Sequence, residues 1–234
     1  MFKLFALLAL VLVVSFTVRA EEAKKPSTIT PMQKDPKRHE QFLAVAKKGD
    51  IDLLFLGDSI TDGWRGGGKK VWETNFAPLK AANFGISGDR TEHVLWRIEN
   101  GELEGIKPKL VVLMIGTNNG GNTKEDVALG ITTIVSEIKK KLPETKVLLL
   151  GIFPRGAKAD DKARAKNNQV NEMVAKLDDG GKTVKYLDIG DKFLDADKNL
   201  PKDIMPDALH PNAKGYEIWA EAILPTVKEM MGAK

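Results

Sequence analysis

Three residues of the kinds used in acyl transfer stand out in this sequence: Ser59, Asp207 and His210. Ser59 follows an apolar run at residues 51–56 that is typical of a buried strand, so a hydroxyl is expected at the carboxyl end of that strand. Asp207 and His210 are three residues apart in a proline-flanked stretch, where a carboxylate can hold one imidazole nitrogen while the other faces outward. Because a serine hydroxyl becomes a good nucleophile only when a base takes its proton, the three residues predict a nucleophile, its base and the acid that orients the base.

Two further positions could stabilise the negative charge that develops during acyl transfer. Gly88 and Asn118 each follow a short apolar run. A glycine lets a backbone N–H face a ligand without an obstructing side chain, and an Asn side chain is itself an N–H donor. Ligands of open α/β sheets bind at the carboxyl ends of strands, so we expect both groups to meet Ser59 there as donors to an oxyanion. Asn118 or Asn119 could instead be a turn former, but Asn118 has the better position relative to the strand end.

Of the three histidines, only His210 has an acid at a useful spacing. His39 lies in a polar segment and is expected to be exposed to solvent. His93 lies beside the apolar stripe of an expected helix at residues 91–99, which predicts a position on the polar surface. A metal site on Asp207 and His210 is an alternative hypothesis, but two ligands without a further His or Cys cluster are few for zinc, and no metal or other cofactor is expected.

The glycine-rich stretch at residues 63–70 nearly matches a phosphate-binding loop. Its glycines and first lysine are spaced as in G-x-x-x-x-G-K-[ST], but Lys70 stands where a hydroxyl would hold magnesium. We therefore expect a mobile loop beside the cleft, in which Trp64 and Arg65 contact the substrate. Asp58 is expected chiefly to hydrogen-bond the turn at the neighbouring serine, with a substrate contact as a second option.

Apolar runs that end in glycine or polar residues alternate with helical patterns along the chain. Strands are expected at residues 51–56, 81–86, 110–115, 146–151 and 183–188. Helices are expected at residues 38–48, 91–99, 126–141 and 163–177, and in a C-terminal segment that Pro225 should kink or break. Alternating β/α units with right-handed crossovers predict an α/β fold, namely a three-layer, doubly wound, parallel five-stranded sheet with helices on both faces.

The length of 234 residues suits one domain behind an export signal. Residues 1–20 combine Lys3, an apolar run at 4–14 and a small final residue, which is typical of a signal peptide. The alternative is an uncleaved anchor helix, but the run is shorter than the roughly 20 residues that a bilayer needs. Residues 21–37 are polar and contain three prolines, so we expect a linker there and a single domain at 38–234.

Charge and cysteine content limit the function classes further. Removing residues 1–20 lowers the formal net charge from +4 to +2, which does not indicate a nucleic-acid partner. The chain has no cysteine, so disulfides, thiolate metal sites and a cysteine nucleophile are excluded. No later run is long enough to span a membrane, and we expect a secreted or periplasmic protein that depends on its core for stability.

Four motifs together resemble the conserved blocks of the SGNH hydrolases, also called the GDSL esterase superfamily. They are GDSI at 57–60, NFGISGDR at 83–90, GTNN at 116–119 and DALHP at 207–211. Within the superfamily, the chain is similar to the catalytic subunits of brain-type platelet-activating factor acetylhydrolase over about residues 50–231. The resemblance implies a flavodoxin-like SGNH hydrolase fold and a catalytic triad of Ser59, His210 and Asp207. It also implies an oxyanion hole made by the backbone N–H groups of Ser59 and Gly88 and the side chain of Asn118.

These observations predict a secreted serine esterase that hydrolyses short acyl esters, chiefly acetyl esters, on carbohydrate. The related acetylhydrolase subunits are intracellular, whereas exported members of the superfamily often deacetylate carbohydrates. A lysophospholipase or thioesterase-type lipid deacylase is the alternative, and a catalytically silent carbohydrate-binding module is a third hypothesis. The expected partner is a small-molecule or carbohydrate ester. A homodimer is a further option because the related subunits pair.

Overall fold

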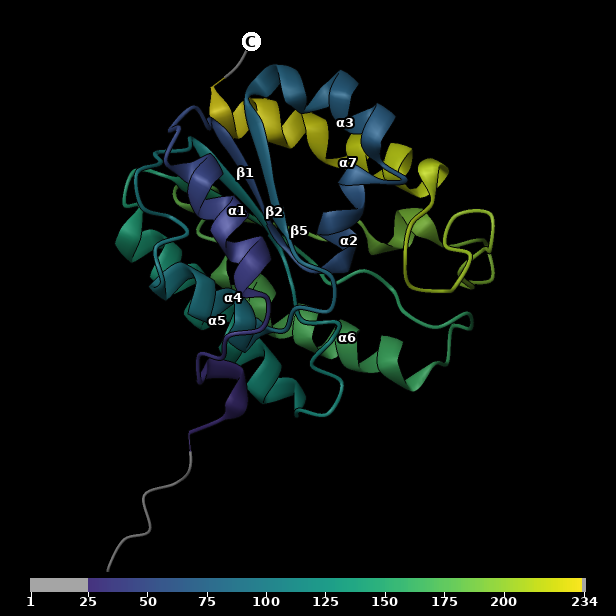
Figure 1. Cartoon of the computed structure of the whole chain (residues 1–234). Helices are drawn as coiled ribbons and strands as arrows, with labels where there is room; N and C mark the ends of the chain where they lie inside the picture. The colour runs from purple at the N-terminus through teal and green to yellow at the C-terminus, as the bar shows by residue number, and fades with distance from the viewer. Residues whose placement is uncertain (1–24, 233–234) are drawn as a thin grey trace, which may run out of the picture.

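The protein is built on one parallel five-stranded sheet, seen in a computed structural model that describes residues 25–232 (Figure 1). The strands are β1 Leu53–Gly57, β2 Ala81–Gly85, β3 Leu110–Met114, β4 Lys146–Leu150 and β5 Val184–Leu187, in the spatial order β2-β1-β3-β4-β5. Each lies within two residues of its predicted bounds. The expected signal peptide lies outside the described residues.

Helices cover both faces of the sheet, as the sequence predicts. They are α1 Pro36–Ala46, α2 Ser59–Asp62, α3 Lys69–Asn75, α4 Thr91–Glu99, α5 Lys124–Lys141, α6 Lys162–Val174 and α7 Ala213–Met231. Short 3-10 turns occur at η1 Ser27–Ile29, η2 Gly63–Arg65, η3 Ala77–Leu79, η4 Ala175–Leu177 and η5 Gly190–Phe193. In Figure 1, α3 and α7 lie on one side of the sheet and α1, α4, α5 and α6 on the other. Pro225 lies inside α7 but does not end it, which corrects the expectation of a break.

Alternation along each strand supplies two separate hydrophobic cores. In β1, Leu54 and Leu56 pack in the core with α1, α4, α5 and α6, whereas Leu53 and Phe55 pack in the core with α3 and α7. All five residues of β1 and of β3 are buried. This is the pattern of central strands covered on both faces, and it confirms the predicted fold class.

The strand order reverses direction beside β1. The chain passes from β1 to β2 on one side and then returns through α4 to β3 on the other side of β1. In open α/β sheets, ligands bind at the carboxyl ends of strands at such a switch point. Gly57 at the end of β1 pairs in register with Met114 at the end of β3, so the loops that follow these strands begin side by side.

The glycine-rich stretch consists of two helical segments joined by a turn at residues 66–68, which corrects the prediction of a loop over residues 63–70. It forms η2 and enters α3, and its aromatic residue Trp64 is only 1% exposed. A Cβ atom on Gly63 would lie 2.0 Å from the Tyr216 hydroxyl oxygen. The glycines therefore allow this segment to pack against α7, which accounts for the partial match to a phosphate-binding loop.

The described part of the predicted linker is docked on the domain. Thr28 in η1 is completely buried, and its carbonyl accepts a hydrogen bond of 3.0 Å from the Thr91 hydroxyl. The backbone N–H of Met32 donates to the carbonyl of Glu92 at 3.1 Å. Residues 25–37 therefore belong to the packed structure, and the sequence missed this because polar residues and prolines also occur in ordered surface segments. Within residues 25–232, no helix combines the length and the apolar character needed to cross a membrane.

Candidate active site

Ser59 is the first residue of α2, immediately after β1, where the sequence placed it. The side chain of Asp58 caps the turn by accepting the backbone N–H of Ile60 at 3.0 Å, and the Tyr216 hydroxyl donates to the Ile60 carbonyl at 2.7 Å. Two separate elements, the strand and α7, thus hold the turn that carries the serine. As the first residue of a helical turn, Ser59 has a backbone N–H without an intrahelical acceptor.

Three side chains from distant parts of the chain form a continuous hydrogen-bonded line. The Ser59 Oγ lies 2.9 Å from His210 Nε2, and His210 Nδ1 lies 2.6 Å from Asp207 Oδ2. The Asp207 side chain is 55% exposed and that of His210 is 43% exposed, so the line is open to solvent. A hydroxyl, an imidazole and a carboxylate in this order can move a proton away from the serine oxygen.

The carboxylate of Asp207 is fixed by the loop that carries His210. Its Oδ1 accepts the backbone N–H groups of His210 at 2.7 Å and Leu209 at 3.1 Å, while Oδ2 faces the imidazole. Partial burial raises the pKa of Asp207, but the hydrogen bonds from His210 outweigh it and hold that pKa below its ordinary value. An ionised Asp207 accepts a hydrogen bond from the Nδ1–H group, which leaves Nε2 unprotonated as the acceptor for the serine hydroxyl.

Gly88 and Asn118 lie in the loops after β2 and β3. Gly88 adopts a φ of 75°, a left-handed conformation that favours glycine. One N–H of the Asn118 amide donates to the carbonyl of Asp89 at 2.9 Å. The amide has a second N–H, which is the group available to an oxyanion. The hydrogen bond to Asp89 ties Asn118 to the loop that carries Gly88.

A buried ionic network supports the loop after β2. Arg97 Nη2 lies 3.0 Å from Asp89 Oδ2, and Arg97 Nη1 contacts Glu102. The side chains of all three residues are at most 3% exposed. A separate contact ties the loop after β3 to α4, because Asn119 Nδ2 donates to Glu92 Oε2 at 3.0 Å. Breaking one partner of such a network leaves a buried charge uncompensated, so the loop conformation is strongly specified.

Both remaining histidines are buried, which corrects the expectations of an exposed His39 and a polar-surface His93. Each is 5% exposed. A ring nitrogen of His39 hydrogen-bonds the carbonyl of Asn100 at 3.0 Å, and the Nδ1 of His93 accepts the backbone N–H of Arg90 at 3.0 Å. Burial lowers the pKa of His39 and lowers that of His93 to about 4. Both therefore serve as neutral packing and capping groups.

Of the three further residues predicted to contact substrate, Trp64 and Asp58 are buried. Trp64 packs among aromatic residues between the sheet and α7, so it does not face a ligand, which corrects the prediction. Asp58 is 1% exposed, and burial raises its pKa to about 7. The guanidinium of Arg65 donates to the carbonyls of Asn83 and Gly85 and lies 5.5 Å from the ring centre of Phe42. Arg65 thus has a structural role at the free edge of β2.

Two residues near the site were not singled out by the sequence. Lys34, in the predicted linker, donates to the carbonyl of Ser87 and lies 3.5 Å from Asp89, beside the Gly88 loop. Arg155, after β4, donates from Nη1 to the carbonyl of Thr117 at 2.9 Å. The sequence signal that could have identified Arg155 is its position just after an expected strand.

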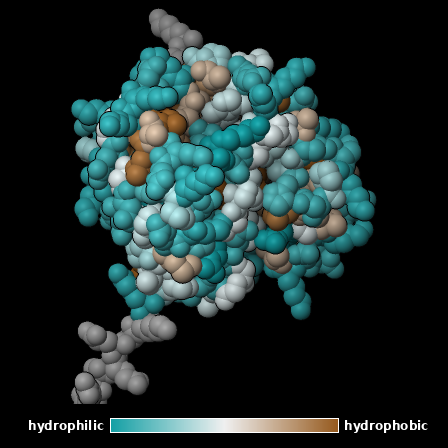
Figure 2. All heavy atoms as spheres, in the orientation of Figure 1, coloured by the Kyte–Doolittle hydropathy of each residue, from teal (hydrophilic) through white to brown (hydrophobic). Residues whose placement is uncertain are grey.

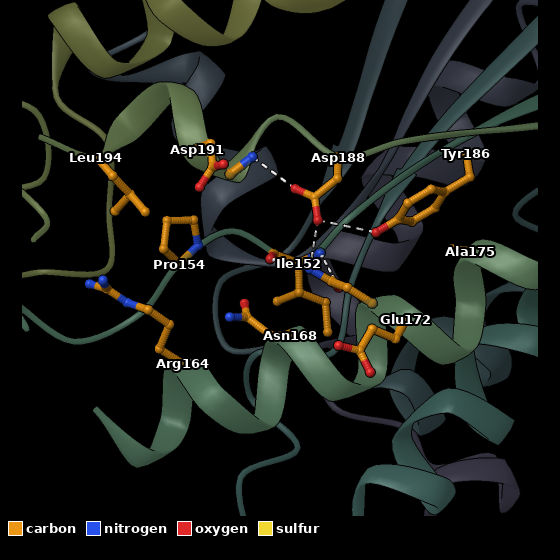
Figure 3. A pocket seen from close by; sticks show the side chains of 12 residues that line it. Ile152, Pro154, Arg164, Asn168, Glu172, Ala175, Tyr186, Asp188, Asp191 and Leu194 are labelled. Atoms are coloured by element: carbon orange, nitrogen blue, oxygen red, sulfur yellow. Dashed lines mark hydrogen bonds between the residues drawn. The ribbon is translucent and has the colours of Figure 1, made fainter. Parts of the chain in front are cut away.

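A cavity of about 520 Å³ lies at the carboxyl end of the outer strand β5, beside α6 (Figure 3). None of the residues predicted to be catalytic or to bind an oxyanion lines it. Its central carboxylate, Asp188, accepts hydrogen bonds from Tyr186 and Asn171 and from the backbone of Gly190. These contacts satisfy the carboxylate. The cavity is separate from the candidate active site because the two share no lining residue.

The arrangement fits acyl transfer better than metal binding. Among residues 25–232, no group of three or more His, Cys, Asp or Glu side chains is placed to hold a metal ion. His210 uses one ring nitrogen on Asp207 and the other on Ser59, so both nitrogens are already engaged. The geometry can activate a serine hydroxyl, because the imidazole beside it can take its proton.

Comparisons with known proteins find similarity to one hydrolase family. A model of the GDSL-like Lipase/Acylhydrolase family matches residues 55–218. Platelet-activating factor acetylhydrolase IB subunit alpha1 of Homo sapiens is 40% identical over 197 residues, which cover 83% of this chain and 84% of that protein. The alpha2 subunit of Rattus norvegicus is 42% identical over 179 residues, covering 76% of this chain and 77% of that protein.

Solved structures share the fold at lower identity. A protein from Bacteroides fragilis assigned as an acylhydrolase has a TM-score of 0.70 and 20% identity, with 85% of this chain and 100% of that chain covered. A catalytic mutant of an acetylxylan esterase from Geobacillus stearothermophilus has a TM-score of 0.58 and 20% identity, with 78% and 94% covered.

Proposed function

Because this chain belongs to the GDSL-like Lipase/Acylhydrolase family, a family of ester-hydrolysing serine hydrolases, we propose that it is an esterase in which Ser59, His210 and Asp207 form the catalytic triad. The observation that carries the proposal is the unbroken hydrogen-bonded line from Ser59 Oγ through His210 to Asp207. The family resemblance predicted from the four motifs is confirmed by the same matches. The triad assignment rests on the distances in this chain.

The reaction would proceed through an acyl-enzyme. His210 Nε2 takes the proton of the Ser59 hydroxyl while Oγ forms a bond to the ester carbonyl carbon. The carbonyl oxygen becomes an oxyanion that accepts hydrogen bonds from the backbone N–H groups of Ser59 and Gly88 and from the Asn118 amide. His210 then gives its proton to the alcohol oxygen as the carbon–oxygen bond breaks. Water then gives a proton to the same imidazole while its oxygen bonds to the acyl carbon. The acid leaves as the bond to Ser59 Oγ breaks and Oγ takes that proton back.

We propose a short acyl group, chiefly acetyl, on a carbohydrate. The curated relatives are named for acetyl release, which supports the acyl part. The exposure of the triad supports a shallow site that suits a hydrophilic alcohol part. The exposed large hydrophobic side chains among residues 25–232 are Met32, Val45 and Leu129, and none lies in the loops of the candidate site. The face shown in Figure 2 is mostly hydrophilic, with only small separate apolar patches, whereas lipid surfaces are usually met by larger ones.

A lipid deacylase is the second candidate. The name of the 40% identical relative, an acetylhydrolase of platelet-activating factor, favours it over the carbohydrate substrate. Acyl chain length separates the carbohydrate esterase from a lysophospholipase-type deacylase, because a long chain needs an apolar channel that an open triad does not supply. The alcohol part of the ester separates it from an acetylhydrolase that acts on a lipid. A catalytically silent carbohydrate-binding module is the third candidate, and labelling of Ser59 by a fluorophosphonate distinguishes it.

The test is an activity profile of the purified chain. The substrates are nitrophenyl esters from acetyl to decanoyl, acetylated xylan, an acetylated sialic acid and a short-chain phospholipid. We expect the highest kcat/KM on acetyl esters, release of acetate from a carbohydrate, and no activity in a folded Ser59→Ala variant. Equal activity of Ser59→Ala would remove Ser59 from the mechanism. A preference for the phospholipid would favour the lipid deacylase.

We further propose export with cleavage after Ala20, on the pattern of residues 1–20. The mature protein would then begin at Glu21 and act outside the cell or in the periplasm. The mass of the protein recovered from the culture medium or periplasm, after expression of the full chain, tests this directly. Light scattering on the same sample decides between a monomer and the homodimer.

A further inference from the structure

A second cavity, of about 570 Å³, opens beside the candidate active site between the loop after β3 and the start of α6. Its polar lining includes Thr117, Asn118, Arg155, Lys162 and Lys166. Building on the proposed esterase function, we propose that this cavity binds an anionic group, a phosphate or a carboxylate, on the alcohol part of the ester. The chain would then prefer acetyl esters of negatively charged alcohols.

The cavity shares one residue with the candidate active site. Asn118, the proposed oxyanion donor, lies in its wall. Arg155 connects the two loops of the site, because its Nη1 donates to the carbonyl of Thr117 at 2.9 Å and the next residue, Gly156, donates to the carbonyl of Ala208 at 2.9 Å. Ala208 lies between Asp207 and His210 in sequence. Asn118 and Arg155 line the same cavity, so a substrate whose carbonyl meets Asn118 could extend its alcohol part toward Arg155.

The charge of the cavity is positive and unbalanced. Three cationic side chains line it and no Asp or Glu side chain does. Within residues 25–232, none of Arg155, Lys162 and Lys166 forms a salt bridge. Lys166 instead donates to the carbonyls of Asn119, Gly120 and Asn122, which are neutral. Its charge thus remains uncompensated beside the cavity, and the loss of water around it lowers the pKa of Lys166.

The positions of the cations suit a phosphate or carboxylate group on the alcohol part of the substrate. The described hydrogen bonds of Arg155 use Nη1 alone, so Nε and Nη2 remain for a bidentate contact with a carboxylate or phosphate. Lys162 is exposed in the first turn of α6, where the helix dipole adds positive potential. The Asp161 carboxylate offsets part of this potential, because it caps the helix by accepting the N–H of Ala163 at 2.8 Å. An acetyl group carries no charge, so the anionic group belongs to the alcohol.

The test compares three aryl acetates of similar size: neutral methyl 4-acetoxybenzoate, anionic 4-acetoxybenzoate and 4-acetoxyphenyl phosphate. The readout is the ratio of kcat/KM for an anionic ester to that for the neutral ester, in wild type and in variants of the full chain. Comparing ratios between proteins cancels differences in leaving-group chemistry. Lys162→Glu should lower the ratio about tenfold, since it exchanges an attractive for a repulsive charge at roughly 5 Å. Arg155→Gln should lower it at least as much.

The matched control is Lys176→Glu, which makes the same change in exposed η4, about 20 Å farther along the same helical segment. Its ratio should equal that of wild type. The wild-type ratio should also fall as sodium chloride is raised, because salt screens the attraction. If Lys162→Glu and Arg155→Gln lower the ratio more for the phosphate ester than for the carboxylate ester, the preferred alcohol is phosphorylated. If they lower it more for the carboxylate ester, the preferred alcohol is uronate-like.

The proposal is overturned if the neutral ester is hydrolysed but Lys162→Glu and Arg155→Gln leave the ratio within about twofold of wild type, or if Lys176→Glu lowers it equally. Failure of the esterase function itself has a different signature. In that case none of the three acetates is hydrolysed faster by wild type than by Ser59→Ala.

Discussion

Replacing Asp207 by asparagine tests the triad at the point where the structure constrains it most. The Oδ1 of Asp207 accepts two backbone N–H groups, from Leu209 and His210, while Oδ2 accepts the imidazole Nδ1–H. In Asp207→Asn the amide must keep its oxygen on the backbone donors, so its NH2 group faces Nδ1. The imidazole must then carry its proton on Nε2, where it can no longer accept the proton of Ser59.

The expected loss follows from these contacts. Turning the amide to restore the correct tautomer gives up two hydrogen bonds, each worth about 1 kcal/mol, and sets N–H groups against N–H groups. The charge-assisted bond that stabilises the imidazolium contributes about 1.5 to 3 kcal/mol more. Together these correspond to a loss of about 10³ to 10⁴ in kcat/KM. Because the Asp207 side chain is 55% exposed and screened by water, we expect the lower end, about 10³.

The assay is hydrolysis of nitrophenyl acetate, accompanied by nitrogen NMR of the histidine rings and a thermal melt. We expect the His210 proton to move from Nδ1 to Nε2 in Asp207→Asn, with little change in melting temperature. The matched control is Asp203→Asn in the same segment. The Asp203 carboxylate lies 2.6 Å from Lys214 Nζ and takes no part in the triad. A loss below about tenfold, or an unchanged tautomer in the variant, would refute the assignment of Asp207 as the residue that orients the imidazole.

Three other substitutions probe the nucleophile turn and the oxyanion loop. Asn118→Ala removes one oxyanion donor and should lower kcat about 10² to 10³-fold on nitrophenyl acetate; a loss under threefold would mean that another donor does this work. The pKa of Asp58 is raised to about 7, so the folded protein keeps this carboxyl protonated where the unfolded chain has already ionised it. Its contribution to stability therefore falls as the pH rises from about 4 to about 7, and Asp58→Asn should flatten that decline in urea unfolding series; parallel curves for the two proteins would contradict this. Gly57→Ala would place a Cβ atom 2.4 Å from the carbonyl oxygen of Met114 and should destabilise the protein by about 3 kcal/mol or more, and a normal urea midpoint would count against tight packing here.

The candidate site was predictable because its residues occupy strand ends. A buried parallel strand has an unmistakable apolar run, and the residue that follows it must emerge at one edge of the sheet. Ser59 and Asn118 were located in this way. Asp207 and His210 needed a second signal, their spacing in a proline-flanked loop.

The errors arose where side-chain burial depends on distant segments. Trp64 follows the nucleophile in sequence, but Tyr216 and Trp219 of α7 enclose it. His93 was assigned to the surface from the stripe of its own helix, yet it is 5% exposed. Hydrophobic periodicity within one helix identifies its apolar packing face. It does not show whether other segments also cover the opposite, polar face.

The sequence by itself determined the strands, the order of the α/β units and the residue types at each strand end, because these depend on local patterns of apolar and turn-forming residues. Tertiary structure alone decided which of those ends converge. The 2.9 Å contact between Ser59 and His210 joins residues 151 positions apart. The neighbouring residues Arg155 and Gly156 bond the oxyanion loop and the histidine loop, respectively. The unpaired positive charge beside Asn118 likewise exists only in the fold, because a cation becomes part of a site when packing removes its water and leaves no carboxylate beside it.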